Sequence, residues 1–237
     1  MSRKKIILIV IATFIIITGI FFSPIFSVKK IEILGSTRFD KGYIVKKSEL
    51  DLSKNIYLLS KKNLKAKLLE NPYIKNIEIS VEFPSTLKLA INERVEVAAL
   101  QYQGKYVLID EEGVALRVEE DIKKANKPLF SGVKLTRVQL GQSTGIKEKE
   151  IFKSISRFIN AAENARIISN ISEINIKDKN NIFILTTQGI QVLIGKGENL
   201  EYKFLELNQI LLNLYSKNIT TGIIDMRFNG YPVYRVR

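Results

Sequence analysis

The two side chains that most often perform chemistry in proteins are missing from this sequence of 237 residues, which contains neither cysteine nor histidine. The lack of cysteine excludes disulfides and thiolate nucleophiles. The lack of histidine excludes an imidazole general base and histidine-containing metal sites. The catalytic arrangements still available are a serine paired with a lysine, a pair of carboxylates, or a bound cation.

Three groups of residues have the composition of such sites, and we interpret each group as structural. Ser23 and Ser27 stand beside a long apolar run, where they mark a helix end, and neither belongs to the S-x-M-x-P-like motif of signal peptidases. The carboxylates of residues 110–112 fit a hairpin turn. Gly195 and Gly197 flank a lysine without the spacing of a phosphate-binding loop. We therefore predict no catalytic, cofactor-binding or metal-binding residues.

The chain is basic, since 37 lysines and arginines against 24 aspartates and glutamates give a net charge of +13. A surface of that sign attracts anionic lipid, cell-wall polymer or acidic protein. The basic residues are not interleaved with aromatic residues that could stack on bases, so we do not expect nucleic acid as a partner. Without a catalytic site, we also expect no small-molecule substrate.

An uncharged, mostly apolar run occupies residues 6–26. A helix of this length covers roughly 30 Å at about 1.5 Å per residue, which matches the hydrocarbon core of a bilayer. The run exceeds the usual ~7–15 apolar residues of a signal peptide, and no A-x-A-like cleavage site follows it. The preceding residues 1–5 are basic, which favours a cytoplasmic location. We predict one uncleaved transmembrane helix over residues 6–26, a cytoplasmic tail over residues 1–5, and an extracytoplasmic chain after Ser27.

Residues 27–97 predict a small domain with the element order β-α-α-β-β. After the first strand, Asp40 and Ser60 can each cap a helix, because their side chains accept hydrogen bonds from unpaired backbone amides. The last two strands give the clearest signal, since apolar residues alternate on both sides of a turn at Pro84. The alternating residues are Ile77, Ile79, Val81 and Phe83 before the turn, and Leu87, Leu89 and Ile91 after it.

This segment resembles a POTRA domain, the polypeptide-transport-associated fold. The resemblance is carried by four short motifs in a fixed order. They are Ile31-Glu32-Ile33-Leu34-Gly35, Asn71-Pro72-Tyr73-Ile74, Phe83-Pro84-Ser85-Thr86-Leu87 and Glu93-Arg94. POTRA domains are protein-docking modules, so the resemblance implies binding and not catalysis.

Residues 98–237 predict a larger domain that combines a mixed antiparallel sheet with two main helices, so the chain as a whole is expected to be α+β. Residues 124–132 are expected to form a loop. Alternating apolar residues and helical spacing locate the other elements. Strands are expected at residues 106–109, 114–118, 174–176, 182–184, 190–194, 222–228 and 231–235, and helices at residues 151–162 and 200–214.

Placed after an anchor and a POTRA-like domain, this segment resembles the FtsQ/DivIB family of bacterial cell-division proteins. The motifs are Glu93-Arg94 with Ala98, Val107-Leu108-Ile109-Asp110 with Gly113, Leu193-Ile194-Gly195, and Ile224-Asp225-Met226-Arg227. Glu96 takes the place of a proline that is usual in the family, and the predicted cytoplasmic tail is shorter than in many relatives. The resemblance implies a non-catalytic scaffold in the cell membrane, concentrated at the division septum.

In that family the last strands form the platform for the coiled-coil division partners FtsL and FtsB/DivIC. An open sheet edge can accept a strand from such a partner. The resemblance implies that Arg227 pairs with an acidic residue of the partner, Phe228 supplies apolar area, and Gly230 admits the partner's backbone. The complete predicted partner-binding set is Ile224, Met226, Arg227, Phe228, Asn229 and Gly230. The alternative is that these residues only close the sheet.

A second function stays open at this point, namely that of a POTRA-bearing component of a protein translocation or secretion assembly. Such a component is expected to carry several POTRA repeats or a membrane barrel. The sequence predicts a single POTRA-like domain, which favours the division scaffold.

Overall fold

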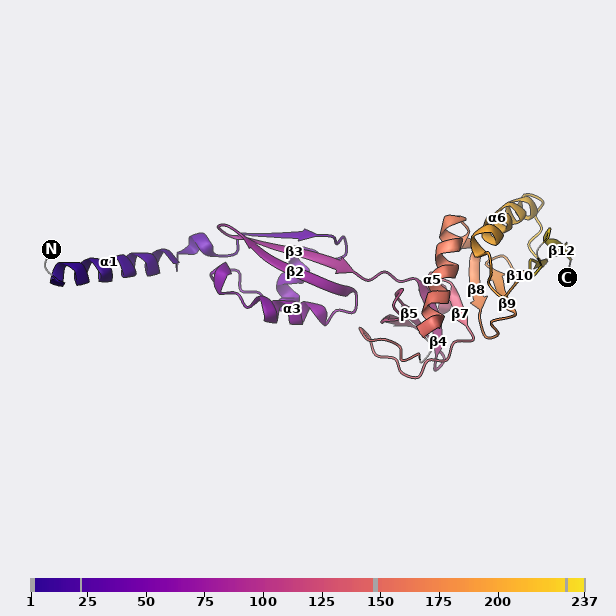
Figure 1. The fold of residues 1–237 in the computed structure, drawn as a ribbon, viewed down its shortest axis with the longest axis horizontal. Coiled ribbons are helices and arrows are strands. Elements are labelled where there is room, and N and C mark those ends of the chain that lie inside the picture. Colours follow the sequence, from indigo (N-terminus) through magenta and orange to yellow (C-terminus); the bar gives the residue numbers. More distant parts are fainter. Residues whose placement is uncertain (1–2, 22, 147–148, 229, 237) are drawn as a thin grey trace. The chain divides into compact units, whose positions relative to one another are not determined.

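The computed structural model describes residues 3–21, 23–146, 149–228 and 230–236. The chain forms two compact units, Met1–Arg94 and Val95–Arg237. The division after Arg94 lies close to the predicted domain boundary after residue 97. Figure 1 shows the elements of both units in chain order, from helix α1 to strand β12.

The apolar run at the start of the chain forms helix α1, Arg3–Phe21, followed by a short 3-10 helix η1, Pro24–Phe26. The continuous helix predicted over residues 6–26 therefore ends earlier than expected. Ser23 is extended and Pro24 lacks a backbone N–H, so the helical hydrogen-bond pattern cannot continue through them. Among the residues that the structure describes, none of the helices combines the length and the apolarity of a membrane-crossing segment. The single membrane span stays a prediction.

The rest of the first unit has the predicted β-α-α-β-β order, with one extra 3-10 helix. The elements are β1 Lys30–Leu34, α2 Lys41–Ser48, η2 Ile56–Leu58, α3 Lys61–Leu69, β2 Ile74–Glu82 and β3 Thr86–Glu93. The sheet has the order β1-β3-β2, in which β1 runs parallel to β3 and β2 is antiparallel to β3. Both predicted helix caps are confirmed, because the amide of Tyr43 donates to Asp40 Oδ1 at 2.7 Å and that of Asn63 donates to Ser60 Oγ at 3.3 Å.

One core joins the two helices to the sheet in this unit. Its buried side chains include Ile44 of α2, Leu64 and Leu68 of α3, and the alternating residues Leu87 and Leu89 of β3. The alternation predicted for β2 is confirmed at residues 77, 79 and 81, which pack on this core. It fails at Phe83, which lies beyond the end of β2 and is 73% exposed.

The second unit is built on one nine-stranded sheet with the order β12-β11-β10-β9-β8-β7-β4-β5-β6. The sheet is mixed, because β4–β7, β7–β8 and β10–β11 are parallel pairs and the remaining pairs are antiparallel. The strands are β4 Ala98–Tyr102, β5 Lys105–Ile109, β6 Ala115–Glu119, β7 Leu129–Ser131, β8 Ile171–Asn175, β9 Ile182–Thr186, β10 Ile190–Gly195, β11 Gly222–Asp225 and β12 Val233–Arg235.

Two long helices, α5 Lys149–Asn164 and α6 Leu200–Ser216, share the core of this unit with the sheet. Figure 1 shows the two helices beside strands β7 to β10. Phe158 of α5 lies between two aromatic neighbours, with ring centroids 6.5 Å from Phe130 of β7 and 6.0 Å from Phe204 of α6. Both helices were predicted, so the expected pairing of a mixed sheet with two main helices is confirmed.

The segment over residues 124–132 differs from the prediction of a loop. It contains the end of a short helix, α4 Ile122–Ala125, and then strand β7, which lies between β4 and β8 in the sheet. Strand β7 has only three residues and directly follows Pro128, so it offers too few positions for an alternating pattern. Strand β4, which was not expected either, begins with two buried alanines, and alanine is a weak strand former.

Candidate functional site

The two serines next to the apolar run form the turn that ends it. The amide of Ile25 donates to Ser23 Oγ at 3.4 Å, so Ser23 is the N-cap of η1. The Ser27 hydroxyl donates to the carbonyl oxygen of Pro24 at 2.8 Å. Both hydroxyls therefore serve local backbone, as the sequence predicts.

The acidic cluster at residues 110–112 forms the turn between β5 and β6. Asp110 is buried, and its Oδ1 accepts hydrogen bonds from the amides of Glu112 at 3.0 Å and Val114 at 2.8 Å. Gly113 has a φ of +76°, and a Cβ there would lie 2.1 Å from the ring of Phe152. The turn thus requires a carboxylate at position 110 and a glycine at position 113, which confirms its structural role.

The glycine pair at residues 195–197 leads from the end of β10 into helix α6. Gly195 and Gly197 have φ angles of +79° and +69°, and Asn199, which precedes the helix, also has a positive φ of 53°. These left-handed conformations reverse the chain direction within a few residues. The segment is the helix-entry turn that the sequence predicts.

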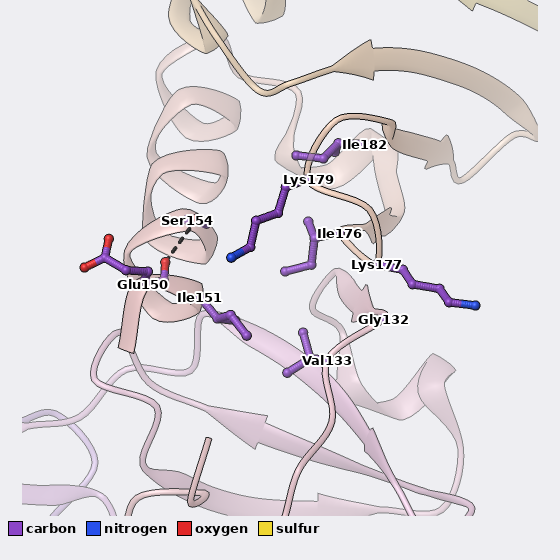
Figure 2. Close-up of a pocket in the computed structure, with 9 residues that line it drawn as sticks. All are labelled: Gly132, Val133, Glu150, Ile151, Ser154, Ile176, Lys177, Lys179 and Ile182. Carbon is purple, nitrogen blue, oxygen red and sulfur yellow. Dashed lines mark hydrogen bonds between the residues drawn. The ribbon is translucent and has the colours of Figure 1, made fainter. Parts of the chain in front are cut away.

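A cavity of about 310 Å³ in the second unit is a candidate for a small-molecule site (Figure 2). It lies between helix α5, the segment that follows β7, and the connection from β8 to β9. Figure 2 shows Lys179 directed into the cavity and Lys177 directed away from it. Ser154 also lines it, but its hydroxyl donates to the carbonyl oxygen of Glu150 at 3.0 Å. That is the bond a serine inside a helix ordinarily makes, so this serine is not activated as a nucleophile.

Metal chemistry finds no support in the part of the chain that the structure describes. Within residues 3–21, 23–146, 149–228 and 230–236, no three acidic side chains come together in a way that could hold a cation. The sequence directs attention to a binding surface on the last strands.

Strand β11 is an interior strand and not the open edge that the sequence suggested. It pairs with β10 on one side and with β12 on the other. Ile224 is fully buried and Met226 is 3% exposed, and both belong to the core that α6 covers. Neighbouring strands and the helix enclose both side chains within this chain, and their contact with a partner stays a prediction.

Arg227, predicted to pair with an acidic residue of a partner, pairs with Asp225 of its own chain. Its Nε and Nη2 donate to the two carboxylate oxygens of Asp225 at 2.9 and 2.7 Å, in a two-pronged geometry. The Asp225 side chain is 4% exposed, whereas that of Arg227 is 40% exposed. The hydrogen bonds from Arg227 hold the pKa of Asp225 below its usual range, although burial acts against them.

Strand β12 is the terminal strand of the sheet order, so no other strand of the described residues pairs with its far edge. It attaches to β11 through Tyr234, whose hydroxyl donates to the carbonyl oxygen of Thr221 at 2.8 Å. Gly222 has a φ of +138°, and a Cβ there would lie 2.5 Å from the Tyr234 ring. The absence of a side chain at position 222 therefore lets β12 close against the sheet.

Three aromatic side chains lie exposed around the segment that connects β11 to β12, and we call them the aromatic patch: Tyr202, Phe228 and Tyr231. Phe228 is 74% exposed and Tyr231 is 96% exposed. Tyr202, in the first turn of α6, lines a small cavity together with Phe228. The guanidinium of Arg227 lies 5.5 Å from the Phe228 ring centroid, close enough for a cation–π contact. Gly230 is exposed beside the patch, and Asn229, also predicted to bind a partner, lies outside the described residues.

Two polar groups of α6 complete the surroundings of the patch. The Tyr202 hydroxyl donates to Glu206 Oε1 at 3.0 Å, and this bond raises the pKa of Tyr202, with a smaller contribution from nearby Tyr231. Lys203 is buried and donates from Nζ to the carbonyl oxygen of Ile194 at 2.8 Å. Burial lowers the pKa of Lys203. The structure thus brings α6 next to the last residues of the chain.

Sequence reasoning found Phe228 and Gly230 but missed Tyr202 and Tyr231. Tyr202 belongs to a helix whose periodicity marks only its buried face, at residues 200, 204, 207 and 211. A tyrosine just outside that face is the signal that could have identified it. Tyr231 follows an Asn-Gly pair, where the sequence indicates a turn but not its contacts.

Comparison with known families agrees with both units. Residues 26–94 match the family model described as "POTRA domain, FtsQ-type", and residues 98–227 match the one described as "Cell division protein FtsQ/DivIB, C-terminal". The second match ends at Arg227, so most of the aromatic patch lies beyond it.

Among curated proteins, the cell division protein DivIB of Clostridium tetani is 29% identical over 94% of this chain and 84% of its own length. Its namesake from Staphylococcus aureus strain NCTC 8325 is 30% identical over 86% of this chain and 45% of its own length. A solved structure of the major extracytoplasmic domain of DivIB from Geobacillus stearothermophilus aligns with 54% of this chain and 98% of that chain, at 13% identity and a TM-score of 0.34.

Proposed function

This chain belongs to the FtsQ/DivIB family of cell division proteins, and we propose that it serves division as a scaffold that binds its partners through the C-terminal corner of the second unit. The proposed binding surface consists of the open edge of β12 and the aromatic patch. The partners would be membrane-anchored division proteins of the FtsL and FtsB/DivIC type. A role in a translocation or secretion assembly is not favoured, because residues 98–227 match a cell-division family model and the relatives named above are cell-division proteins.

The observation that carries the proposal is the exposure of large aromatic rings in the segment that leads into β12, the last strand of the described sheet. Phe228 and Tyr231 are 74% and 96% exposed, whereas most other aromatic side chains of the second unit are buried or half-buried. Tyrosine and phenylalanine are enriched at the centres of protein interfaces, where one ring can dominate the binding energy. An open edge offers backbone hydrogen bonds to an added strand, and neighbouring rings then provide side-chain selectivity.

We further propose that the apolar run at residues 6–26 holds the chain in the cell membrane at the septum, with the N-terminus in the cytoplasm. The support is that the large apolar side chains of α1 are exposed to solvent along the helix, including Ile7, Leu8 and Phe14. An exposed apolar surface of that extent needs a non-aqueous environment. A cytoplasmic reporter fused after Arg237 should be silent if the second unit is outside the cytoplasm.

We also propose that the protein has no catalytic activity of its own. The support is that Ser23, Ser27 and the Asp110 carboxylate, which the sequence singles out, are engaged in capping and turn hydrogen bonds. Ser154→Ala, which alters the cavity that Ser154 lines together with Lys177 and Lys179, should leave growth complementation intact. Loss of complementation by a stably folded Ser154→Ala protein would require an enzymatic function.

The binding surface is tested with the extracytoplasmic part of the chain, residues 28–237, and the extracytoplasmic part of a partner of the FtsB/DivIC type. Phe228→Ala should weaken binding by about 10- to 100-fold, since covering such a ring contributes roughly 1.5–3 kcal/mol. Tyr231→Ala should weaken it to a similar extent. Neither variant should change the melting temperature, because both rings are exposed.

Leu212→Ala is the matched control, because Leu212 is a large exposed apolar residue as well. It belongs to α6 and lies ten residues after Tyr202. At about 1.5 Å per residue this places it roughly 15 Å along the helix from the patch. Its removal should leave binding unchanged. Equal binding by all three variants would refute the proposed surface, and a large fall in melting temperature would show that the rings close the sheet instead.

A further inference from the structure

We propose that one end of the first unit lies in the interfacial layer of the bilayer, with a cluster of three aromatic rings, Phe26, Tyr57 and Phe83, facing the lipid headgroups. The proposal rests on the membrane anchoring proposed above. It assigns a lipid-binding role to the POTRA-type unit in addition to its fold.

The three rings come from segments that are far apart in the sequence and meet at one end of the unit. Phe26 of η1 has its ring centroid 5.8 Å from that of Tyr57 in η2 and 6.1 Å from that of Phe83, both in edge-to-face orientation. Backbone contacts hold these segments together. Ser27 forms a bridge with Asn55, and the amide of Lys29 donates to the carbonyl oxygen of Ser85 at 3.0 Å.

The cluster is exposed despite its apolar character. Phe83 is 73% exposed and Tyr57 is 45% exposed, and their neighbours Ile25 and Leu58 are exposed as well. If the alternation of β2 continued, the side chain of Phe83 would point toward the core. Phe83 instead lies in the turn that follows β2, and its side chain is exposed. A contiguous apolar surface of this kind on a folded unit indicates an interaction site. Phenylalanine with tyrosine, which has a polar tip, is the composition found where a protein meets the membrane surface.

Lipid is the occupant that the chain connection favours. Helix α1 ends at Phe21, so five peptide units separate it from Phe26 and span at most about 18 Å when fully extended. Because α1 carries the apolar run, the aromatic cluster cannot lie far from whatever covers that run. A headgroup layer several ångströms thick on each side of the hydrocarbon is within this reach.

The charges around the cluster are also suited to an anionic lipid surface. Lys29 and Lys61 are exposed next to η1 and η2, and Lys62 follows on α3. The acidic groups nearby are paired with lysines, Asp51 with Lys54 at 3.9 Å and Glu82 with Lys88 at 2.7 Å. The ring surface is therefore bordered by lysines that form no ion pair among the described residues, and anionic headgroups attract such positive charge.

The full-length chain offers a clean probe of this contact because it contains no tryptophan. Phe83→Trp places a single fluorophore in the cluster. The protein is reconstituted into vesicles of phosphatidylcholine and phosphatidylglycerol, with or without brominated acyl chains, which quench tryptophan on contact. Leu34→Trp is the matched control, since Leu34 is also exposed but lies at the opposite end of β1 from Ser85. Phe14→Trp reports separately on the apolar run.

The expected result is loss of emission in brominated vesicles for Phe83→Trp and Phe14→Trp, and no loss for Leu34→Trp. Tyr57→Trp should behave like Phe83→Trp, and it replaces that variant if Phe83→Trp unfolds the unit. Quenching of Phe14→Trp alone would refute the lipid contact and leave the anchor intact. If even Phe14→Trp escapes quenching, the anchor and the contact both fail. Protection from an aqueous quencher without quenching by brominated lipid would show that a second protein chain covers the cluster, which also overturns the proposal.

Discussion

The pair formed by Asp225 and Arg227 gives the sharpest test of how the C-terminal corner is built. Arg227→Met keeps most of the apolar part of the side chain and removes the guanidinium, so both hydrogen bonds to Asp225 are lost. If Arg227 is a structural residue, as the geometry indicates, the variant should lose stability. If it is a partner contact, the variant should lose binding and keep its stability.

The magnitude follows from the burial of the two side chains. The Asp225 side chain is 4% exposed, so without Arg227 it becomes a buried carboxylate deprived of its strongest hydrogen bonds. Removing one partner of a fully buried pair costs about 3–5 kcal/mol, but Arg227 is 40% exposed and water can replace part of its contribution. We therefore expect a loss of about 1.5–3 kcal/mol, the range of hydrogen bonds to a charged group.

The effect should also depend on pH in a definite direction. Arg227 lowers the pKa of folded Asp225 below its ordinary value of 3.8, so its contribution to stability is complete above pH 3.8 and is lost as the pH falls through the folded pKa. The difference between the wild-type and Arg227→Met proteins should thus be constant near neutrality. It should shrink once the pH falls below about 3.8.

Urea unfolding of residues 28–237, followed by circular dichroism between pH 2.5 and 7, measures both effects. Arg235→Met is the control, because Arg235 is exposed and acts on Asp225 only through its charge, and we expect it to lose less than about 0.5 kcal/mol. Equal stability of Arg227→Met and wild type at pH 7 would refute a structural role. If Arg227→Met kept its stability but no longer bound the partner, Arg227 would be a partner contact.

Two further predictions concern the packing of the second unit. Gly113→Ala should destabilise it by about 2–5 kcal/mol, because the new Cβ would lie 2.1 Å from the Phe152 ring at a φ of +76°. Gly104→Ala, with a similar φ of +77° but open space around it, should cost only about 1–2 kcal/mol, and equal losses would contradict the steric argument. Burial lowers the pKa of Lys203, so the unfolded chain binds this proton more tightly than the folded chain does, and the stability of the wild type should rise as the pH increases toward 10.5. Lys203→Met should abolish this rise. Urea unfolding between pH 7 and 10.5 measures this, and an unchanged pH dependence would show that Lys203 is not the cause.

The first unit could be predicted almost completely because its signals are local. Asp40 and Ser60 accept backbone hydrogen bonds at the first turns of the helices, and the hairpin alternates on both sides of a single turn. The failure at Phe83 has a specific cause. Strand β2 ends one residue earlier, and the turn that follows determines the direction of the side chain, whatever the alternation indicates.

Strands β4 and β7 escaped prediction for the opposite reason, since sequence-distant neighbours determine them. Strand β7 is three residues long and pairs in parallel with β4 and β8, and such pairing leaves no hairpin signal in the sequence. In the candidate site, too, neighbours that are distant in the sequence decide which side chains are buried. Ile224 is apolar and so is Phe228, yet the first is enclosed by β10, β12 and the core under α6 while the second is 74% exposed. Residue type alone could not separate the two.

The pair formed by Asp225 and Arg227 and the exposed rings are parts of one arrangement. Asp225 is held at the end of β11, and its two hydrogen bonds fix the guanidinium of Arg227. That guanidinium in turn lies 5.5 Å from the Phe228 ring centroid, so the neighbour of the exposed ring is held in place. A ring that is already oriented loses less conformational entropy on binding, so the binding free energy is more favourable. Arg227 can thus matter for partner binding without touching the partner, and its substitution should weaken binding less than that of Phe228, which supplies the contact area itself.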